Sequence, residues 1–212
     1  MNIKCKVCQS SDFDNSIQFG SQPVSHHYLS PKDKINTELD IPLTLCQCYN
    51  CGTIQLKNLA ELTYYNVRFP WVRQNEPEAH LDNLVQQIIS LPRINSNSSI
   101  WGMSYKDKTT IDRFRDFGFK NCRTIDYSNM VNSQDQINNI SLTQSLVNRT
   151  VIKRLINNDG KPDVIIARHL LEHAHNTSDF LKALQMVTSC GCYLVLEIPE
   201  CSRLIHKLDY TM

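Results

Sequence analysis

The stretch Asp163-Val164-Ile165-Ile166-Ala167-Arg168-His169 decides the fold class of this chain. Four consecutive apolar residues between polar ends are typical of a strand that is buried on both faces of a parallel sheet. A second run of this kind, Cys-Tyr-Leu-Val-Leu-Glu-Ile, occupies residues 192–198. Between the two runs, residues 178–187 place apolar side chains at helical spacing. This order of strand, helix and strand predicts a right-handed βαβ unit.

The same alternation of strands and helices extends upstream of this unit. We predict three further strands at residues 99–102, 122–126 and 141–147, and two further helices at residues 109–117 and 149–157. Gly118 is placed to cap the first of these helices. The predicted fold class is therefore α/β, with residues 97–212 forming part of a Rossmann-like parallel sheet. The chain has only six glycines and no G-x-G-x-x-G fingerprint.

Two cysteine pairs stand near the N-terminus. They are Cys5-Lys-Val-Cys8 and Cys48-Tyr-Asn-Cys51, with Gly52 directly after the second pair. Two C-x-x-C knuckles supply the four thiolates that one tetrahedral Zn²⁺ needs, and a closed Cys₄ site holds structure without doing chemistry. We predict a zinc-binding module over residues 1–60, with Cys46 as a bystander because Cys46-Gln-Cys48 is one residue short of the usual spacing; the alternative is that Cys46 replaces Cys48 as a ligand. The alternative is a small β module with buried free thiols.

Residues 61–96 are expected to connect the two modules. An aromatic, proline-interrupted segment over residues 61–75 predicts a loop. Pro77, flanked by Glu76 and Glu78, then opens a helix, because proline and acidic residues are favoured in a first turn. Pro92 ends this helix.

Composition excludes several classes of protein. The chain has 212 residues, with 22 Lys and Arg against 21 Asp and Glu, and no basic run that would mark a nucleic-acid binder. No stretch of about 18 apolar residues predicts a membrane span, and the first residues carry no secretory signal. Nine cysteines, an odd number, exclude complete internal disulfide pairing. We therefore expect a cytoplasmic protein that binds neither nucleic acid nor membrane.

Three predicted strand ends form a candidate binding crevice, because ligands of such sheets bind at the carboxyl ends of the strands. Asp126, at the end of the second strand, is suited to accept two hydrogen bonds from a ribose diol. The alternatives are that Asp126 caps the following turn, that His169 is a structural histidine and that Lys106-Asp107 is a solvated turn. The candidate contacts at the three strand ends are Gly102, Ser104, Lys106, Asp126, Arg168 and His169.

These modules, in this order, resemble S-adenosylmethionine-dependent sugar C-methyltransferases, which carry an N-terminal zinc-binding domain, a class I methyltransferase domain and a C-terminal extension. The resemblance implies S-adenosylmethionine as cofactor, contacted at Gly102, Asp126 and His169, and a nucleotide-linked deoxy-keto sugar as substrate. Its more specific motifs are C-x-x-C-G-x-x-Q-L and R-H-x-L-E-H. The stretches that carry it are Cys5–Cys8, Pro42-Leu43, Cys48–Leu56, Asn75–Asp82, Asp163–His173 and Leu196–Glu200.

Several features depart from the family pattern. The usual glycine-rich cofactor loop is replaced by Gly102-Met-Ser-Tyr-Lys-Asp107, which keeps one glycine. The family's Glu-His pair, which includes the proposed general base, does not occur here, so no catalytic base is assigned. The last two strands of the family's sheet do not occur either, which leaves residues 192–198 as an exposed edge. We expect either a fragment or a homodimer that covers this edge.

The leading hypothesis is therefore a methyltransferase of the sugar C-methylating type. In that chemistry a base removes a proton next to a sugar keto group, and the enolate carbon attacks the methyl of the cofactor. The alternative is a non-catalytic zinc-containing binding or assembly module derived from such an enzyme. The charge balance argues against a zinc-ribbon nucleic-acid binder. Candidates for a sugar pocket at the junction, with packing as the alternative, are His26, His27, Tyr64 and Tyr65.

Overall fold

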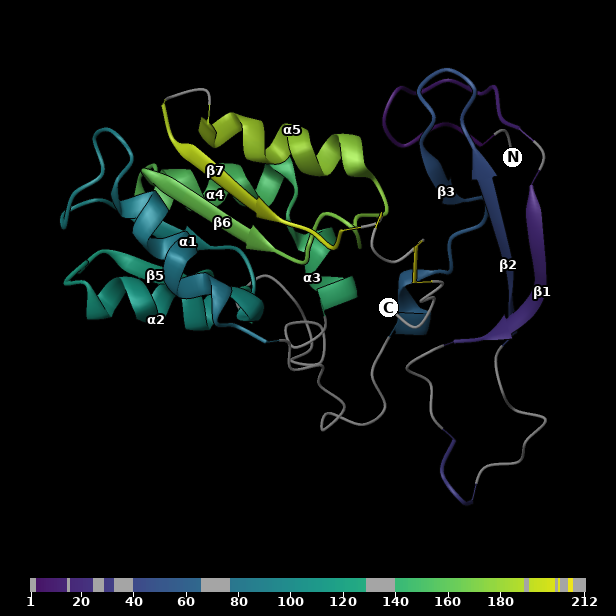
Figure 1. The fold of residues 1–212 in the computed structure, drawn as a ribbon, viewed down its shortest axis with the longest axis horizontal. Helices are drawn as coiled ribbons and strands as arrows, with labels where there is room; N and C mark the ends of the chain where they lie inside the picture. The colour runs from purple at the N-terminus through teal and green to yellow at the C-terminus, as the bar shows by residue number, and fades with distance from the viewer. Residues whose placement is uncertain are drawn as a thin grey trace.

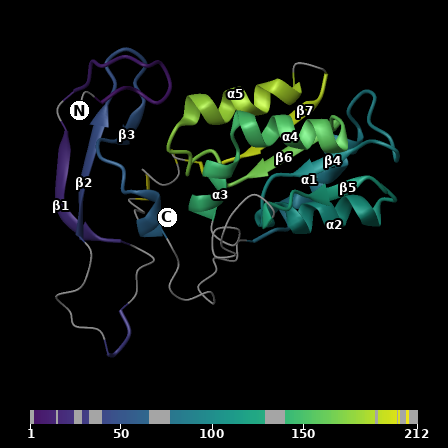
Figure 2. The ribbon, with the colours of Figure 1, turned by 180° about the vertical axis from the view of Figure 1, so that it is seen from behind.

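The structure is a computed structural model in which two modules lie side by side (Figures 1 and 2). A small β module holds the N-terminal part of the chain, and an α/β domain follows it. The residues that the structure describes are 3–14, 16–24, 29–32, 40–65, 77–128, 140–188, 191–200, 202 and 206–207.

The N-terminal module is built on a three-stranded antiparallel sheet in the order β1-β2-β3. Its strands are β1 (Ile17–Pro23), β2 (Asp40–Gln47) and β3 (Ile54–Leu56). In β2 the side chains of Thr44 and Cys46 are buried and their neighbours are not, which is the period of a strand covered on one face. A short 3₁₀ helix, η2 (Leu62–Tyr65), follows the sheet.

The second module contains a four-stranded parallel sheet in the order β5-β4-β6-β7. Its strands are β4 (Ile100–Gly102), β5 (Cys122–Thr124), β6 (Val164–Arg168) and β7 (Tyr193–Glu197). The register places Gly102 between Thr124 and Ile166, and Arg168 beside Glu197. The predicted α/β class with a parallel sheet is confirmed.

Helices cover both faces of this sheet (Figure 1). One face carries α1 (His80–Ile89) and α2 (Lys108–Asp116), and the other carries α3 (Ile140–Leu146), α4 (Arg149–Asp159) and α5 (Thr177–Thr188). Each layer of helices encloses its own apolar core, and alternate residues of β6 enter the two cores. All five residues of β6 are therefore buried, which explains the unbroken apolar run over its first four residues.

The predicted third strand at residues 141–147 is wrong, because α3 occupies this segment. The sequence Ile-Ser-Leu-Thr-Gln-Ser-Leu begins with an alternation that resembles a strand, and so short a segment does not separate the two periods. Leu142, Thr143 and Gln144 are buried one after another, so the segment lacks the alternating burial of a strand that is covered on one face.

Other element boundaries shift by a few residues. The helix expected to open at Pro77 begins at His80, and Glu76 lies outside the described residues. Gly118 follows α2 with φ of +84°, in agreement with the predicted cap. Within the described ranges, no helix combines the length and apolarity needed to cross a membrane.

The strand β7 lies at an edge of the parallel sheet. Leu196 is 36% exposed and Ile198, just beyond the strand, is 55% exposed. These are the features of the exposed edge expected from residues 192–198. The homodimer that would cover this edge stays a prediction.

Candidate functional site

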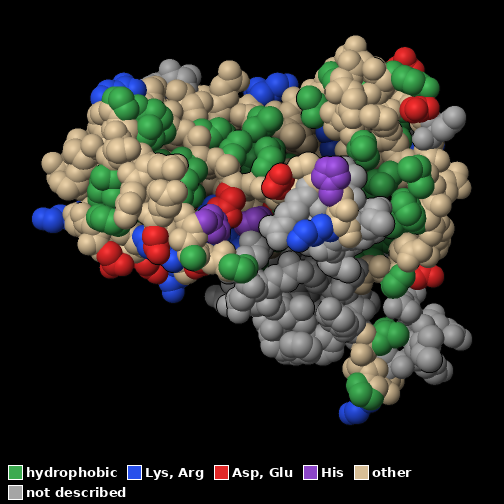
Figure 3. All heavy atoms as spheres, in the orientation of Figure 1, with side chains coloured by type: hydrophobic (Ala, Val, Ile, Leu, Met, Phe, Trp, Pro, Cys, Tyr) green, Lys and Arg blue, Asp and Glu red, His purple; other side chains and the backbone are tan. Residues whose placement is uncertain are grey.

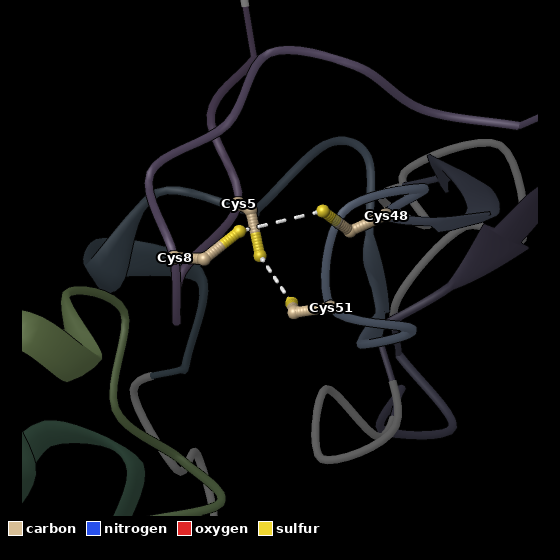
Figure 4. A group of neighbouring side chains, drawn as sticks. All are labelled: Cys5, Cys8, Cys48 and Cys51. Carbon is tan, nitrogen blue, oxygen red and sulfur yellow. Dashed lines mark hydrogen bonds between the residues drawn. The ribbon is translucent and has the colours of Figure 1, made fainter.

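The sulfur atoms of the four knuckle cysteines gather in one cluster (Figure 4). The Sγ atoms of Cys5 and Cys51 are 3.6 Å apart, and those of Cys8 and Cys48 are 3.5 Å apart. All four lie within 4.8 Å of one another. A tetrahedral zinc ion with Zn–S bonds of about 2.3 Å places its sulfurs roughly 3.8 Å apart. The cluster therefore has the ligand type, number and spacing of a zinc site.

The two knuckles are tied to each other by a side chain as well as by their sulfurs. Gln55, in β3, is only 7% exposed. Its Oε1 accepts from the backbone N of Lys6 at 2.9 Å, and its Nε2 donates to the carbonyl of Lys4 at 3.1 Å. Gln55 thus holds the first knuckle against β3, the strand that follows the second knuckle. Sequence reasoning gave it no role, although a polar residue at a fixed place in C-x-x-C-G-x-x-Q-L was the available signal.

The thiols differ in their surroundings. A hydrogen bond from the Asn50 side chain lowers the pKa of Cys8 to about 6, whereas burial raises the pKa of Cys48 to about 11. Since Zn²⁺ binds the thiolate form, metal binding must displace the Cys48 proton. Cys46 lies outside the cluster: its Sγ donates to the backbone carbonyl of Gln55 at 3.6 Å.

In the loop after β4, the side chain of Asp107 fills the space beside Gly102. The loop forms a short 3₁₀ helix, η3 (Tyr105–Asp107), whose last residue is fully buried. The Asp107 carboxylate accepts from Ser104 N at 2.8 Å and from Arg168 N at 3.0 Å. A Cβ on residue 102 would lie 2.6 Å from the Cβ of Asp107, so the glycine makes room for this side chain. The interpretation of Lys106-Asp107 as a solvated turn is therefore wrong for Asp107.

Arg168 is buried at the end of β6. Its side chain is 1% exposed, and Nε donates to Oε2 of Glu197 at 2.8 Å. Nη1 donates to the carbonyl of Lys106 at 2.7 Å and lies 3.4 Å from Glu78. Burial alone would raise the pKa of Glu197, but hydrogen bonds from His169 and Arg168 lower it to about 2. Arg168 and Glu197 therefore form a partly buried ion pair between neighbouring strands.

His169 joins the same carboxylate. Its Nε2 lies 3.0 Å from Oε1 of Glu197, and its Nδ1 lies 3.0 Å from Oε1 of Glu172. His80, at the start of α1, approaches the same Glu197 oxygen at 3.2 Å. His169 has φ of 53°, a left-handed conformation that costs a non-glycine residue about 1–2 kcal/mol. Histidine and acidic side chains lie next to one another on the face shown in Figure 3.

Asp126 lies beyond the end of β5 with an exposed side chain. Its carboxylate accepts from Ser128 N at 2.8 Å, a bond that lowers the pKa of Asp126 and keeps it ionised. Of the junction candidates, Tyr65 makes an edge contact with His175 at 5.5 Å between ring centroids. His26 and His27 lie outside the described residues.

The structure brings the predicted crevice residues into two groups. The first group is held together by Asp107 and Glu197, neither of which sequence reasoning selected; Glu197 could have been found because it ends a predicted strand beside Arg168. Asp126 stands at the neighbouring strand end, where its carboxylate accepts from Ser128 N. The first group consists of Gly102, Ser104, Lys106, Arg168 and His169.

A comparison with protein-family models agrees with the cysteine cluster. Residues 5–63 match the family Methyltransf_13, which is described as "Putative zinc binding domain". The comparison with curated proteins gave no match. The match and the four-sulfur cluster together support zinc in this module and associate the chain with methyltransferases.

Proposed function

We propose that the chain is an S-adenosylmethionine-dependent methyltransferase that C-methylates a nucleotide-linked deoxy-keto sugar in the cytoplasm. One observation carries the proposal: a methyltransferase-associated zinc module precedes a parallel sheet whose β5 strand leads to an exposed, ionised carboxylate, Asp126. Bound S-adenosylmethionine would supply an activated methyl group on a sulfonium. The closed Cys₄ cluster would hold structure, since it has no free coordination position.

The two halves of the expected cofactor site differ in their fit. The Asp126 carboxylate is open to solvent and suits the two hydroxyls of a ribose. At the end of β4, by contrast, the Asp107 side chain fills the space beside Gly102, and the amide of Ser104 already donates to it. Gly102 and Ser104 therefore do not fit as a cradle for the methionine part of the cofactor.

This closed loop favours a second candidate function. A non-catalytic zinc-containing binding or assembly module would keep the fold and need no open cradle. The buried pairing of Arg168 with Glu197 supports it, because a guanidinium that is 1% exposed is positioned to stabilise the sheet and not to meet a ligand.

Calorimetric titration of S-adenosylmethionine into the zinc-loaded chain separates the two candidates. If the chain is a methyltransferase, we expect it to bind S-adenosylmethionine with a dissociation constant near micromolar, which is about 8 kcal/mol of binding free energy. Asp126→Asn should weaken this binding about tenfold or more, because hydrogen bonds to a charged acceptor contribute about 1.5–3 kcal/mol. Asp116→Asn, at the exposed end of α2, is the matched control and should bind as the unmodified chain does. No heat and no thermal stabilisation would favour the non-catalytic module.

A further inference from the structure

The helices α4 and α5 lie side by side on one face of the sheet (Figure 2), and a shallow cavity that is widely open to solvent lies over them. This open cavity has a volume of about 740 Å³. Each helix contributes cationic and neutral side chains one helical turn apart, so one face of each helix is turned to the cavity. The lining residues are Arg149, Thr150 and Lys153 from α4, and Lys182, Gln185 and Met186 from α5.

A second cavity continues the first toward the zinc module. Its volume is about 300 Å³, and it shares Lys182 and Gln185 with the first. On its far side it is lined by Lys6 and Val7, which belong to the first cysteine knuckle. The two cavities therefore make one groove, the α4–α5 groove, which runs along α5 from α4 to the zinc module.

Every charged residue that lines the α4–α5 groove is a cation. They are Arg149, Lys153, Lys182 and Lys6, and no carboxylate lines either cavity. None of the four forms an ion pair with any residue that the structure describes. The whole chain has a net charge of only +1, so the groove concentrates positive charge that the rest of the molecule balances. Such a surface attracts negatively charged partners.

Apolar side chains lie among these cations. Val7 is 62% exposed, Leu181 is 38% exposed, and Met186 is half-buried against the core. Methionine adapts to differently shaped partners, which makes it common at binding surfaces. No aromatic side chain lines either cavity, so the groove has no platform on which nucleic-acid bases would stack.

We propose that the α4–α5 groove docks an acidic amphipathic helix of a partner protein. Carboxylates of that helix pair with the groove's cations, while its apolar face covers Leu181 and Met186. The groove runs along α5, whose 12 residues correspond to about 18 Å of helix. This proposal rests on the groove alone and does not depend on methyl transfer.

The test is a fluorescence-anisotropy titration of the full, zinc-loaded chain with a labelled acidic amphipathic peptide made of Glu and Leu at helical spacing. The groove variant is Lys153→Glu/Lys182→Glu, and the matched control is Lys108→Glu/Lys120→Glu, which makes the same charge change away from the groove. All four lysines are exposed, so both variants should fold. The groove variant should weaken peptide binding at least tenfold and the control less than twofold.

A second variant tests the apolar part of the surface. Leu181→Gln removes an exposed leucine without changing charge and should weaken the peptide about threefold at any salt concentration. The proposal is overturned if the peptide does not bind at millimolar concentration, or if both double variants bind it equally. A single-stranded oligonucleotide that binds more tightly than the peptide, with the same dependence on Lys153 and Lys182, would overturn it in favour of a nucleic-acid site.

Discussion

Neutralising Glu197 should destabilise the α/β domain, because this carboxylate balances a buried arginine. Arg168 is 1% exposed and Glu197 is 20% exposed, and Nε of the arginine donates to the carboxylate at 2.8 Å. In Glu197→Gln the guanidinium stays buried, but its nearest carboxylate loses its charge. Breaking a buried ion pair from one side costs more than the pair contributes, since the remaining charge has left water without compensation.

The expected loss of stability depends on the contacts that Arg168 keeps in Glu197→Gln. Removal of one partner from a fully buried pair costs about 3–5 kcal/mol. Here Glu78 still lies 3.4 Å from Nη1, and the Lys106 carbonyl still accepts at 2.7 Å. Glu197 is also partly screened by solvent. We therefore expect a loss of about 2–3 kcal/mol, which lowers the melting temperature of a chain of this size by roughly 4–12 °C.

Urea unfolding, followed by circular dichroism at 222 nm in the presence of zinc, measures this loss. Glu200→Gln is the control, because Glu200 is an exposed glutamate three residues further on that accepts from the Ser202 hydroxyl at 2.8 Å. It should change the free energy of unfolding by less than about 0.5 kcal/mol. The reasoning is refuted if the two variants unfold at the same urea concentration.

A double variant separates the buried charge from other effects of the substitution. Arg168→Met in the Glu197→Gln background removes the unpaired guanidinium as well. Because apolar replacements of a buried pair are often neutral, this variant should recover at least half of the lost stability. A further loss in the double variant would show that Arg168 stabilises the fold mainly through its bond to the Lys106 carbonyl.

Three further predictions concern zinc, the loop after β4 and acid. Elemental analysis should find one zinc per chain in the unmodified protein and in Cys46→Ser, but less in Cys48→Ser, because only Cys48 belongs to the sulfur cluster. Gly102→Ala should cost about 2 kcal/mol in urea unfolding, since its Cβ would lie 2.6 Å from that of Asp107; an unchanged midpoint would contradict the close approach. The pKa of Glu197 falls from 4.5 to about 2 on folding, so its contribution is present above pH 4.5 and is lost as the pH falls toward 2. The difference in unfolding free energy between the unmodified chain and Glu197→Gln should therefore become smaller over that range. A difference that does not change with pH would show that the charge of Glu197 is not what stabilises the fold.

Local patterns were sufficient to predict the four strands of the parallel sheet and the sulfur cluster. The apolar runs at β6 and β7 are long enough to identify strands, and the C-x-x-C spacing fixes how far apart two sulfurs can lie. At residues 141–147 the same method failed. An alternation over a few residues fits strand and helix equally, and in the folded chain the segment is a helix with three successive buried residues, Leu142, Thr143 and Gln144.

For the candidate crevice, too, the sequence located the residues and the fold decided their contacts. Its residues were selected because they follow strands, and the structure places them at strand ends. The partners of Arg168 lie far away along the chain: its side chain pairs with Glu197, 29 residues later, and its backbone amide donates to Asp107, 61 residues earlier. Spacing along the chain carries no information on such pairings.

The sequence by itself determined the α/β class, the zinc module and the strand ends where candidate ligand contacts lie, because periodicity and ligand spacing are properties of short segments. Only the tertiary structure decided that Asp107 fills the space beside Gly102 and that Glu197 neutralises Arg168. It alone also showed that Lys6 of the zinc module and Lys182 of α5 line one groove. The physical reason is that burial and charge pairing depend on which distant segments pack together.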